Sequence, residues 1–257
     1  MIRPAMLLLA AGATGSIKGP HIETAAIVEM IHIATLLHDD VLDNGEIRRN
    51  QKTINALKGN KTAILLGDWV LAQAFDMICS LKSNRCQKLM SETAKRICQG
   101  ELCQTINENQ IITEQQYIDI IIDKTACFFS CCCQLGAIIN RANDNLLQDL
   151  ADFGVNFGIA FQIFDDIADI TNLPNQSSKT ARLNLKQGKF SLPVINYLEN
   201  GGKIDIDSET LIENITNSGC IDYANTIANK HLQKASKNLS KLPNSDFKTS
   251  LASFLKS

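Results

Sequence analysis

Residues 26–43 have the sequence AIVEMIHIATLLHDDVLD, an apolar pattern with helical spacing that ends in a group of acidic residues. A second stretch, GIAFQIFDDIAD at residues 158–169, repeats the combination. In the first stretch, apolar side chains recur at spacings of three and four, which places them on one stripe of a helix. The stripe consists of Ile27, Met30, Ile31, Ala34 and Leu37. The two stretches predict long core helices and an all-α fold.

The same helical pattern covers most of the remaining chain. We expect helices over residues 62–81, 87–104, 114–137, 145–170 and 221–239, and another in the apolar segment near the N-terminus. Residues 172–187, rich in Asn, Gln, Ser and Lys, predict a long loop, and a second break is expected at 200–208. Because no repeat or linker is found, we predict a single domain over residues 1–257.

Composition narrows the class of protein. Of the 257 residues, 45% are hydrophobic and 20% are charged, so the chain can bury a sizeable core. The formal net charge of −2 excludes the basic surface of a general nucleic-acid binder. No apolar run reaches the roughly 20 residues needed to cross a bilayer, so no transmembrane segment is expected.

Nine cysteines, three of them consecutive at 131–133, have neither a disulfide-like nor a zinc-like spacing. We interpret them as reduced thiols that serve as small apolar side chains, which favours a cytoplasmic protein. The first residues, MIRPAMLLLAAGA, also have the features of a short secretory signal. A signal is therefore the alternative to a helix of the domain at this end.

The two acidic groups share one spacing. Asp39 and Asp43 are four residues apart, as are Asp165 and Asp169, so each pair projects from one face of a helix. Two solvated acidic turns are the simpler interpretation, because acids are common on surfaces. Both groups follow apolar sequence, however, where like charges are costly unless cations neutralise them. Mg2+ prefers oxygen ligands and shares them with substrate phosphates, so the pattern favours a site for a metal-bound polyanion.

Basic residues near these acids fit a phosphate-binding pocket. Arg48 and Arg49 follow the first acidic group, and Lys124 follows a helical stretch. Lys179 and Lys189 flank part of the loop that follows the second acidic group. Arg forks onto phosphate oxygens and Lys supplies a point charge. Each alone is typical of a surface, but together with the acids they predict a diphosphate pocket. The chain has no nucleophile elbow, Walker loop or dinucleotide-binding glycine motif.

These motifs resemble blocks of the trans-polyprenyl diphosphate synthase family, especially of its long-chain type. Residues 21–75 contain the first acidic block, then RRNQKT, then GNKTAILLGDWVLAQAF, in the family's order. Further similar blocks are QGELCQ at 99–104, KTACFF at 124–129, GIAFQIFDDIAD at 158–169 and GKFSLP at 188–193. The resemblance covers most of the chain and implies an isoprenoid synthase fold, which is a helical bundle around a deep central cavity.

The resemblance implies Mg2+-dependent addition of isopentenyl diphosphate to an allylic diphosphate. It implies that the metal ligands are Asp39, Asp43 and Asp165, with Asp169 as a further candidate. Lys124 joins the first three as an expected catalytic residue. The implied ligands of the allylic diphosphate are Arg48, Lys124, Thr125, Gln162, Lys179 and Lys189, and those of isopentenyl diphosphate are Arg3, His21 and Arg49.

The resemblance also implies a homodimer, and a product length set by the helix that precedes Asp39. Ala34 and Thr35, five and four residues before Asp39, are not aromatic, so no plug is expected there. A long product, such as a quinone side-chain precursor, is implied. Two alternatives remain open: a short-chain synthase that makes geranyl, farnesyl or geranylgeranyl diphosphate, and a non-catalytic partner subunit of a heteromeric synthase.

Three features depart from the family pattern. The family's N-terminal helix, and a Gly-Gly-Lys before the arginine matched by Arg3, are not found, so we expect this domain to lack that helix. In the loop SKTARLNLKQGK at 178–189, Ser178 and Arg182 stand where the family has glycine. Asn184 stands where the family has aspartate, and the lost carboxylate is expected to weaken loop closure or a metal contact.

Overall fold

The computed structural model describes residues 1–171, 185, 187–204 and 211–256. In this part the regular secondary structure is helical apart from one short β-ribbon, which confirms the all-α prediction. In chain order the elements are α1 (Ile2–Thr14), α2 (Gly19–Leu42), β1 (Ile47–Arg48), β2 (Gln51–Lys52), α3 (Ile54–Lys58), α4 (Asn60–Ser80), α5 (Asn84–Ile106), α6 (Glu114–Ile121), the π-helical turn η1 (Ile122–Ala126), α7 (Cys127–Ile139), α8 (Asp144–Thr171), α10 (Leu192–Glu199), α11 (Leu211–Asn217), α12 (Cys220–Ser240), α13 (Asp246–Ser253) and the 3-10 turn η2 (Phe254–Lys256).

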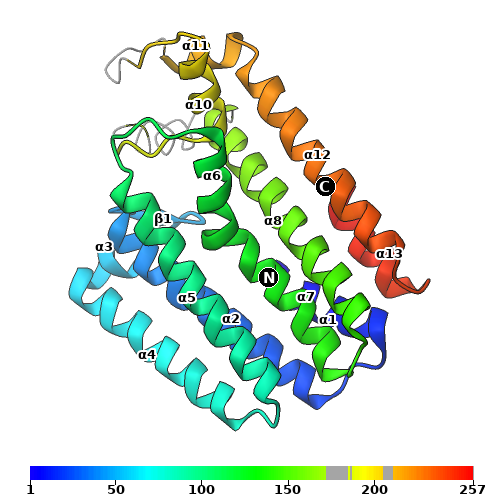
Figure 1. Cartoon of the computed structure of the whole chain (residues 1–257). Coiled ribbons are helices and arrows are strands. Elements are labelled where there is room, and N and C mark those ends of the chain that lie inside the picture. The colour runs from blue at the N-terminus through cyan, green and yellow to red at the C-terminus, as the bar shows by residue number, and fades with distance from the viewer. Residues whose placement is uncertain (172–184, 186, 205–210, 257) are drawn as a thin grey trace.

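Helix α8 is central to the bundle (Figure 1). It packs against α7 and α12, α1 packs against α7 and α2, and α4 lies against α2. Aromatic rings join α7 to α8, since Phe129 makes edge contacts with Phe157 and Phe161 at centroid distances of 5.2 Å each. Such contacts stabilise a core beyond the area they bury. These ring contacts hold α7 and α8 together in the core.

Helices α7 and α8 approach closely because glycines lie between them. A Cβ atom on Gly154 would lie 2.5 Å from the Cα of Ser130, and one on Gly158 would lie 2.5 Å from the Cα of Ala126. The two glycines are four residues apart and share one face of α8. This contact fixes α8 relative to α7, and with it the position of the second acidic group.

Most of the predicted helices are found, with ends shifted by a few residues. The helix expected over 114–137 is instead divided into α6, η1 and α7, because the chain takes one π-helical turn at Ile122–Ala126. The β-ribbon was not expected, since strands of two residues are too short to show alternation. The loop predicted at 172–187 lies mostly outside the described residues, as does much of the second break.

The apolar segment near the N-terminus forms α1, whose buried side chains include Met6, Leu7 and Ala10. The structure therefore supports a helix of the domain at this position.

The cysteine interpretation is correct for six of the nine thiols, which are buried, whereas Cys79, Cys98 and Cys103 are exposed. All nine are unpaired. Burial raises the pKa of Cys131 to about 12, so this thiol is not ionised at neutral pH.

By length and hydropathy alone, two helical stretches of the described chain are long and apolar enough to cross a membrane. The stretch Glu114–Ile139 is mostly buried inside the molecule, as core helices are. Helix α4 is mostly exposed, and passing this test is weak evidence for a membrane span. Its apolar surface nevertheless needs an explanation.

A substitution at the contact between α7 and α8 tests the packing. We expect Gly154→Ala to lower the free energy of unfolding by about 1–3 kcal/mol, because the new methyl group would overlap the Ser130 backbone. Gly19→Ala is the matched control, since a Cβ at that helical position meets nothing within 4 Å. Urea unfolding followed by circular dichroism measures both. Equal stability of the two variants would contradict the close approach.

Candidate active site

Two cavities lie between the two acidic groups. The larger, of about 820 Å³, is lined by Asp39 from α2 and Asp165 from α8. The smaller, of about 360 Å³, is lined by Asp43, Asp165 and Asp169. We call them the large cavity and the polar cavity. They meet at four side chains that line both: Arg48, Lys124, Gln162 and Asp165.

The large cavity has a charged wall and an apolar wall. Part of the wall is charged, and part is formed by the apolar side chains of Leu36, Ile97, Leu102, Phe128 and Phe161. A ligand with an anionic head and an apolar body fits such a division. Of the residues singled out from the sequence, the large cavity gathers Arg3, Asp39, Arg48, Arg49, Lys124, Thr125, Gln162 and Asp165, and the polar cavity adds Asp43, Asp169 and Lys189. Lys179, Ser178, Arg182 and Asn184 lie outside the described residues.

The carboxylates are held in an environment that disfavours their charge. Burial raises the pKa of Asp39 to about 6, although the charge of Lys124 acts in the opposite direction. Burial, together with the charges of Asp165 and Asp166, raises the pKa of Asp169 to about 7. A cation beside these groups would reverse the effect by favouring the ionised form.

The donor set suits a hard divalent cation, because carboxylate oxygens are its preferred ligands. Within the described part of the chain, no three Asp, Glu, His or Cys side chains converge closely enough to hold a metal ion by themselves. The pairs Asp39–Asp43 and Asp165–Asp169 instead lie on separate helices around the cavities. The residues therefore fit Mg2+ whose remaining ligands come from a bound anion.

The second aspartate of each group has a different function in the fold. Asp40 is 8% exposed and accepts a 2.7 Å hydrogen bond from Nε of Arg48. Asp166 accepts hydrogen bonds from Tyr117 Oη at 2.7 Å and from Gln162 Nε2 at 2.9 Å. These carboxylates hold neighbouring side chains in place. The outer aspartates line the cavities, and Asp166 also lines the polar cavity.

Three cationic side chains in the cavities are paired with the protein's own acceptors. Lys124 Nζ lies 2.6 Å from Glu101 Oε2 and donates to Gln104 Oε1 at 2.7 Å. Burial alone would lower the pKa of Lys124, but the charges of Glu101 and Asp39 outweigh burial and raise it. Arg48 is paired with Asp40, as described above. An entering diphosphate would compete for these donors.

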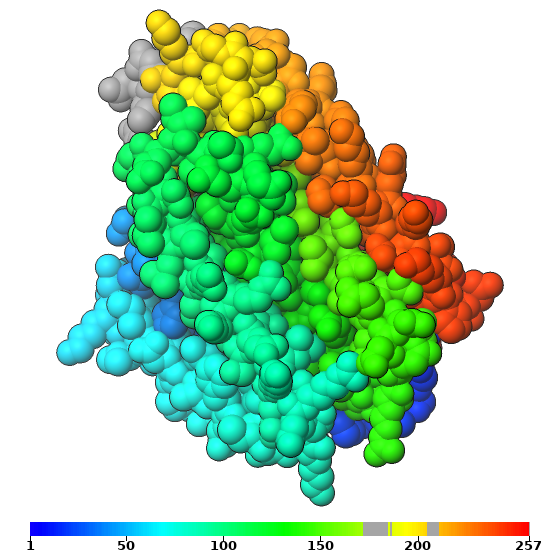
Figure 2. Space-filling model, viewed as in Figure 1, coloured from blue at the N-terminus to red at the C-terminus, as the bar shows by residue number. Residues whose placement is uncertain are grey.

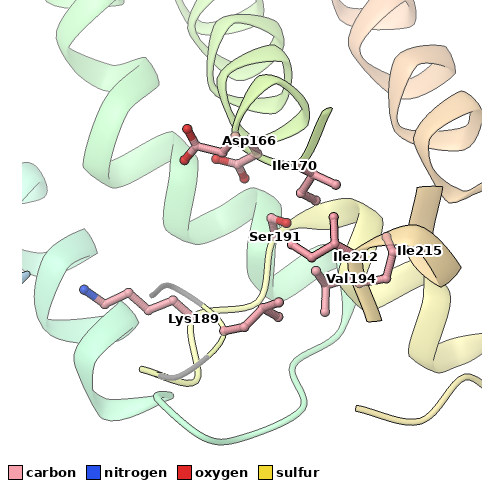
Figure 3. A pocket seen from close by; sticks show the side chains of 9 residues that line it. Asp166, Ile170, Lys189, Ser191, Val194, Ile212 and Ile215 are labelled. Atoms are coloured by element: carbon pink, nitrogen blue, oxygen red, sulfur yellow. The ribbon is translucent and has the colours of Figure 1, made fainter. Parts of the chain in front are cut away.

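Lys189 is the third of these cations. Its Nζ contacts Oδ1 of Asp43 and lies 3.7 Å from Glu108 Oε1. A small pocket of about 30 Å³ lies beside the second acidic group. In Figure 3 the Lys189 side chain at this pocket extends away from Asp166. A Cβ on Gly188 would lie 2.1 Å from the backbone nitrogen of Asn109, so only glycine permits this approach to the α5–α6 loop. The contact directs Lys189 toward the end of α2.

The π-helical turn η1 presents Lys124 and Thr125 to the cavities. A Cβ on Gly100 would lie 2.4 Å from the backbone nitrogen of Lys124, so α5 packs directly against the turn. Thr125 Oγ1 donates to Gln162 Oε1 at 2.9 Å, which ties the turn to α8. Single π-turns within helices are frequent at functional sites. Helical periodicity in the sequence did not reveal this one.

The β-ribbon positions Arg48 and Arg49. Its two-residue turn consists of Arg49 and Asn50, both left-handed with φ of 50° and 62°. Hairpin turns of this kind favour Asn and Gly, whereas a long side chain at the first position costs free energy. Backbone strain of this sort is found where the side chain must point in a required direction. Here Arg49 lines the large cavity.

The assignment of His21 to the substrate site is wrong. His21 is fully buried at the start of α2, where Nδ1 accepts from the Lys18 backbone and Nε2 contacts the Gly136 carbonyl oxygen at 3.2 Å. Both ring nitrogens are therefore used to hold the helix start. It is His32 that lines the large cavity. The signal that sequence reasoning missed is that His32 precedes Asp39 by seven residues, two turns along the same helix face.

Arg3 and His32 form a cationic corner of the large cavity. Arg3 Nη1 donates to Nε2 of His32 at 3.2 Å. The guanidinium also lies over the rings of Phe128 and Phe129, 5.3 and 4.7 Å from their centroids. Burial and the charge of Arg3 lower the pKa of His32 to about 3, so the imidazole is neutral and accepts this hydrogen bond. The guanidinium of Arg3 thus offers a cationic group separate from Lys124 and Lys189.

Comparison with known proteins gives a consistent result. The family model described as "Polyprenyl synthetase" matches residues 1–227. The chain is 31% identical to geranylgeranyl diphosphate synthase of Methanosarcina mazei over 97% of this chain and 82% of that protein. It is 38% identical to octaprenyl diphosphate synthase of Escherichia coli over 78% of this chain and 62% of that protein. The crystal structure of a decaprenyl diphosphate synthase from Rhodobacter capsulatus superposes with a TM-score of 0.91 at 30% identity, covering 99% and 83% of the two chains.

Neutralising Asp169 should stabilise the metal-free protein at alkaline pH. Its pKa of about 7 in the folded state exceeds the ordinary 3.8, so stability falls as the pH rises between these values. We expect Asp169→Asn to raise the melting temperature by a few degrees at pH 8, about 1 kcal/mol after solvent screening, and by less at pH 5. Asp76→Asn, at an exposed acid of α4, should have little effect. Calorimetry in a chelating buffer measures both, and a gain that does not depend on pH would contradict the prediction.

Proposed function

Because this chain belongs to the polyprenyl synthetase family, we propose that it adds isopentenyl diphosphate units to an allylic diphosphate and makes a long-chain polyprenyl diphosphate. The observation that carries the proposal is the pairing of two carboxylate groups, on α2 and α8, around cavities that also hold cationic side chains and an apolar wall. An allylic diphosphate has the matching chemistry, with a polyanionic head and an apolar chain.

We propose that Mg2+ is bound by Asp39 and Asp43 on one side and by Asp165 and Asp169 on the other, together with oxygens of the allylic diphosphate. The metal supplies positive charge that stabilises the departing diphosphate as the allylic C–O bond breaks. The pKa values of Asp39 and Asp169, which burial raises, support this assignment, because a bound cation would favour the ionised carboxylates.

In this mechanism, cationic side chains of the protein bind the allylic diphosphate. Lys124, Lys189 and Arg48 would exchange their present partners Glu101, Asp43 and Asp40 for phosphate oxygens. The family resemblance adds Lys179 to this set. Charge-assisted hydrogen bonds from these groups strengthen as negative charge develops on the leaving oxygen, so they lower the barrier as well as bind the substrate.

We propose that Arg3, Arg49 and His32 bind isopentenyl diphosphate. Arg3 and Arg49 line the same cavity as Asp39, and the neutral His32 orients Arg3. Bound there, the isopentenyl double bond would attack the allylic carbon. The new cation would then lose a proton to give a chain longer by one unit. The released diphosphate is the proposed proton acceptor.

The long-chain assignment rests on the wall formed by α2. Thr35, four residues before Asp39, lines the large cavity with a small side chain. Ala34 is 1% exposed within the core and is not among the lining residues, so only one of the two expected positions faces the cavity. A shorter product is the alternative, since one relative is a geranylgeranyl diphosphate synthase. We further propose that the product is a quinone side-chain precursor and that the enzyme is cytoplasmic, which the unpaired thiols support.

We also propose that the protein is a homodimer formed through α4 and α5. These helices run along one side of the molecule and form a continuous part of its surface in Figure 2. Leu65 and Trp69 on α4 are 58% and 60% exposed, and Leu102 and Ile106 on α5 are 62% and 69% exposed. We call these four the α4–α5 apolar face. A second copy would cover this face and explain the apolar surface of α4.

An elongation assay tests the proposed activity. Purified protein is given farnesyl diphosphate, labelled isopentenyl diphosphate and Mg2+, and the products are separated by chain length. We expect a ladder of long products, reduced at least about 100-fold by Asp39→Ala because an essential carboxylate is lost. Asp76→Ala, at an exposed acid of α4, should keep full activity.

Other outcomes of this assay separate the alternatives. Products that stop at 20 carbons or fewer would favour a short-chain synthase. No incorporation by the chain alone, with activity restored by a second synthase chain, would favour the partner-subunit interpretation. Activity that survives both Asp39→Ala and chelation of Mg2+ would contradict the proposed site.

Charge placed on the α4–α5 apolar face tests the dimer. We expect the wild type to sediment as a dimer and Trp69→Glu to shift it toward monomer at micromolar concentration, because an unpaired carboxylate would be buried in the interface. Ile22→Glu is the control, since Ile22 is 61% exposed but lies at the start of α2. A wild-type monomer, or equal dissociation of both variants, would contradict the assignment.

A further inference from the structure

The direction of Lys124 depends on the register of the π-helical turn η1. The backbone N–H of Cys127 reaches the carbonyl oxygen of Ile122, five residues earlier, so the turn contains one residue more than an α-helix of the same span. Successive helical residues point about 100° apart, so relaxation to an α-helix would rotate the turn's side chains by about that angle. Lys124 lines both cavities only in the present register. Contacts that hold the turn therefore direct this lysine.

Helix α5 makes such contacts along one row of residues. Arg96, Gly100 and Gln104 are four residues apart and so share one face of α5. Gly100 lets the backbone of Lys124 approach, and Gln104 accepts a hydrogen bond from Lys124 Nζ. Arg96 binds the residue before Lys124, since its Nε and Nη2 lie 2.7 and 2.6 Å from Oδ1 of Asp123. The row thus contacts two successive residues of the turn.

The pair of Arg96 and Asp123 lies outside the candidate active site. Neither side chain lines the large cavity or the polar cavity. The two side chains are 45% and 29% exposed, so they form a partly solvated ion pair. Such pairs add little to the stability of a whole fold, because water screens the charges and ordering two side chains costs entropy. The pair can therefore direct the turn locally without being required for folding.

A bound diphosphate would change which contacts tie the turn to α5. Lys124 Nζ now lies 2.6 Å from Glu101 Oε2 and donates to Gln104 Oε1. A diphosphate that takes this ammonium group replaces both of these contacts. The ion pair of Asp123 with Arg96 involves no atom of the lysine side chain, so it persists. Its importance for the direction of Lys124 is therefore greatest in the substrate complex.

We propose that Arg96 and Asp123 are positioning residues, whose ion pair holds η1 in register against α5 so that Lys124 keeps facing the cavities when a diphosphate takes its ammonium group. The inference rests on the proposed prenyltransfer, in which Lys124 binds the allylic diphosphate. Neither member of the pair touches substrate. Their effect is confined to the diphosphate that Lys124 faces and leaves the isopentenyl diphosphate site unchanged.

Loss of either partner tests the pair in the elongation assay. Arg96→Gln and Asp123→Ala should each lower kcat/KM for farnesyl diphosphate about fivefold, because a misplaced ammonium group contacts the diphosphate less well. The KM for isopentenyl diphosphate should change less than about twofold, since no ligand of that site is lost. The melting temperature should fall by less than about 2 °C, as expected for a partly solvated pair.

The two variants also separate positioning from a general effect of charge. Arg96→Gln removes a positive charge and Asp123→Ala removes a negative one, so a long-range effect on an anionic substrate would have opposite signs. Positioning requires that both variants be slower than the wild type. A wild-type kcat/KM in either variant, or an increase in Asp123→Ala, would overturn the proposal.

Arg85→Gln is the matched control. Arg85 also lies on α5, and its Nη2 lies 2.9 Å from Oδ1 of Asp144 at the start of α8. This pair joins two helices but does not contact η1, so kcat/KM for farnesyl diphosphate should be unchanged. Equal losses in Arg85→Gln and Arg96→Gln would contradict the proposal, because any broken ion pair of α5 would then slow the enzyme.

Binding of inorganic diphosphate with Mg2+ tests the inference without turnover. In calorimetry, Arg96→Gln should weaken binding about fivefold in the wild type but less than about twofold in Lys124→Met, because the pair acts through the lysine. A wild type that shows this coupling but does not elongate would refute the proposed function and keep the inference. Binding that Arg96→Gln leaves unchanged, or losses that multiply in the double variant, would overturn the inference even in an active synthase.

Discussion

Four carboxylates gathered around the two cavities are the constraint on which the rest of this structure depends. Burial and mutual repulsion raise the pKa of Asp39 and Asp169 toward neutrality, so the folded chain bears a cost that unfolding would relieve. Carboxylates with strongly raised pKa values cluster at functional sites, so these raised values indicate a functional site. The cations nearby offset part of it, and in the chain as described Lys189 contacts Asp43 directly.

The arrangement of the bundle follows from this constraint. The carboxylates lie on two helices that must stay in register, and glycines allow the supporting helices to approach until backbones touch. Gly158 places α8 against Ala126, and Gly100 places α5 against Lys124. Such close contacts tolerate little movement, because packed interiors transmit small displacements. The second acidic group and the η1 turn are therefore held in place by the core.

Within each acidic group, neighbouring aspartates make different contacts. The outer aspartates line the cavities, and Asp166 does so too, but Asp40 and Asp166 also accept hydrogen bonds from Arg48, Tyr117 and Gln162. Adjacent residues on a helix point in directions about 100° apart, so one can face a ligand while the next faces the protein. A repeated acid in the sequence thus serves two purposes, and the inner member orients the side chains that would surround the substrate.

The sequence by itself determined the helices, the pairing of acids at a spacing of four and most of the basic residues near them. These features are local, because helical periodicity decides which side chains share a face. The tertiary structure decided between His21 and His32, since the choice depends on whether the ring nitrogens meet Gly136 or Arg3. It also decided the π-turn at Lys124 and the contact of Tyr117 with Asp166. Those features arise from packing between segments far apart in the chain, and no local pattern of residues encodes them.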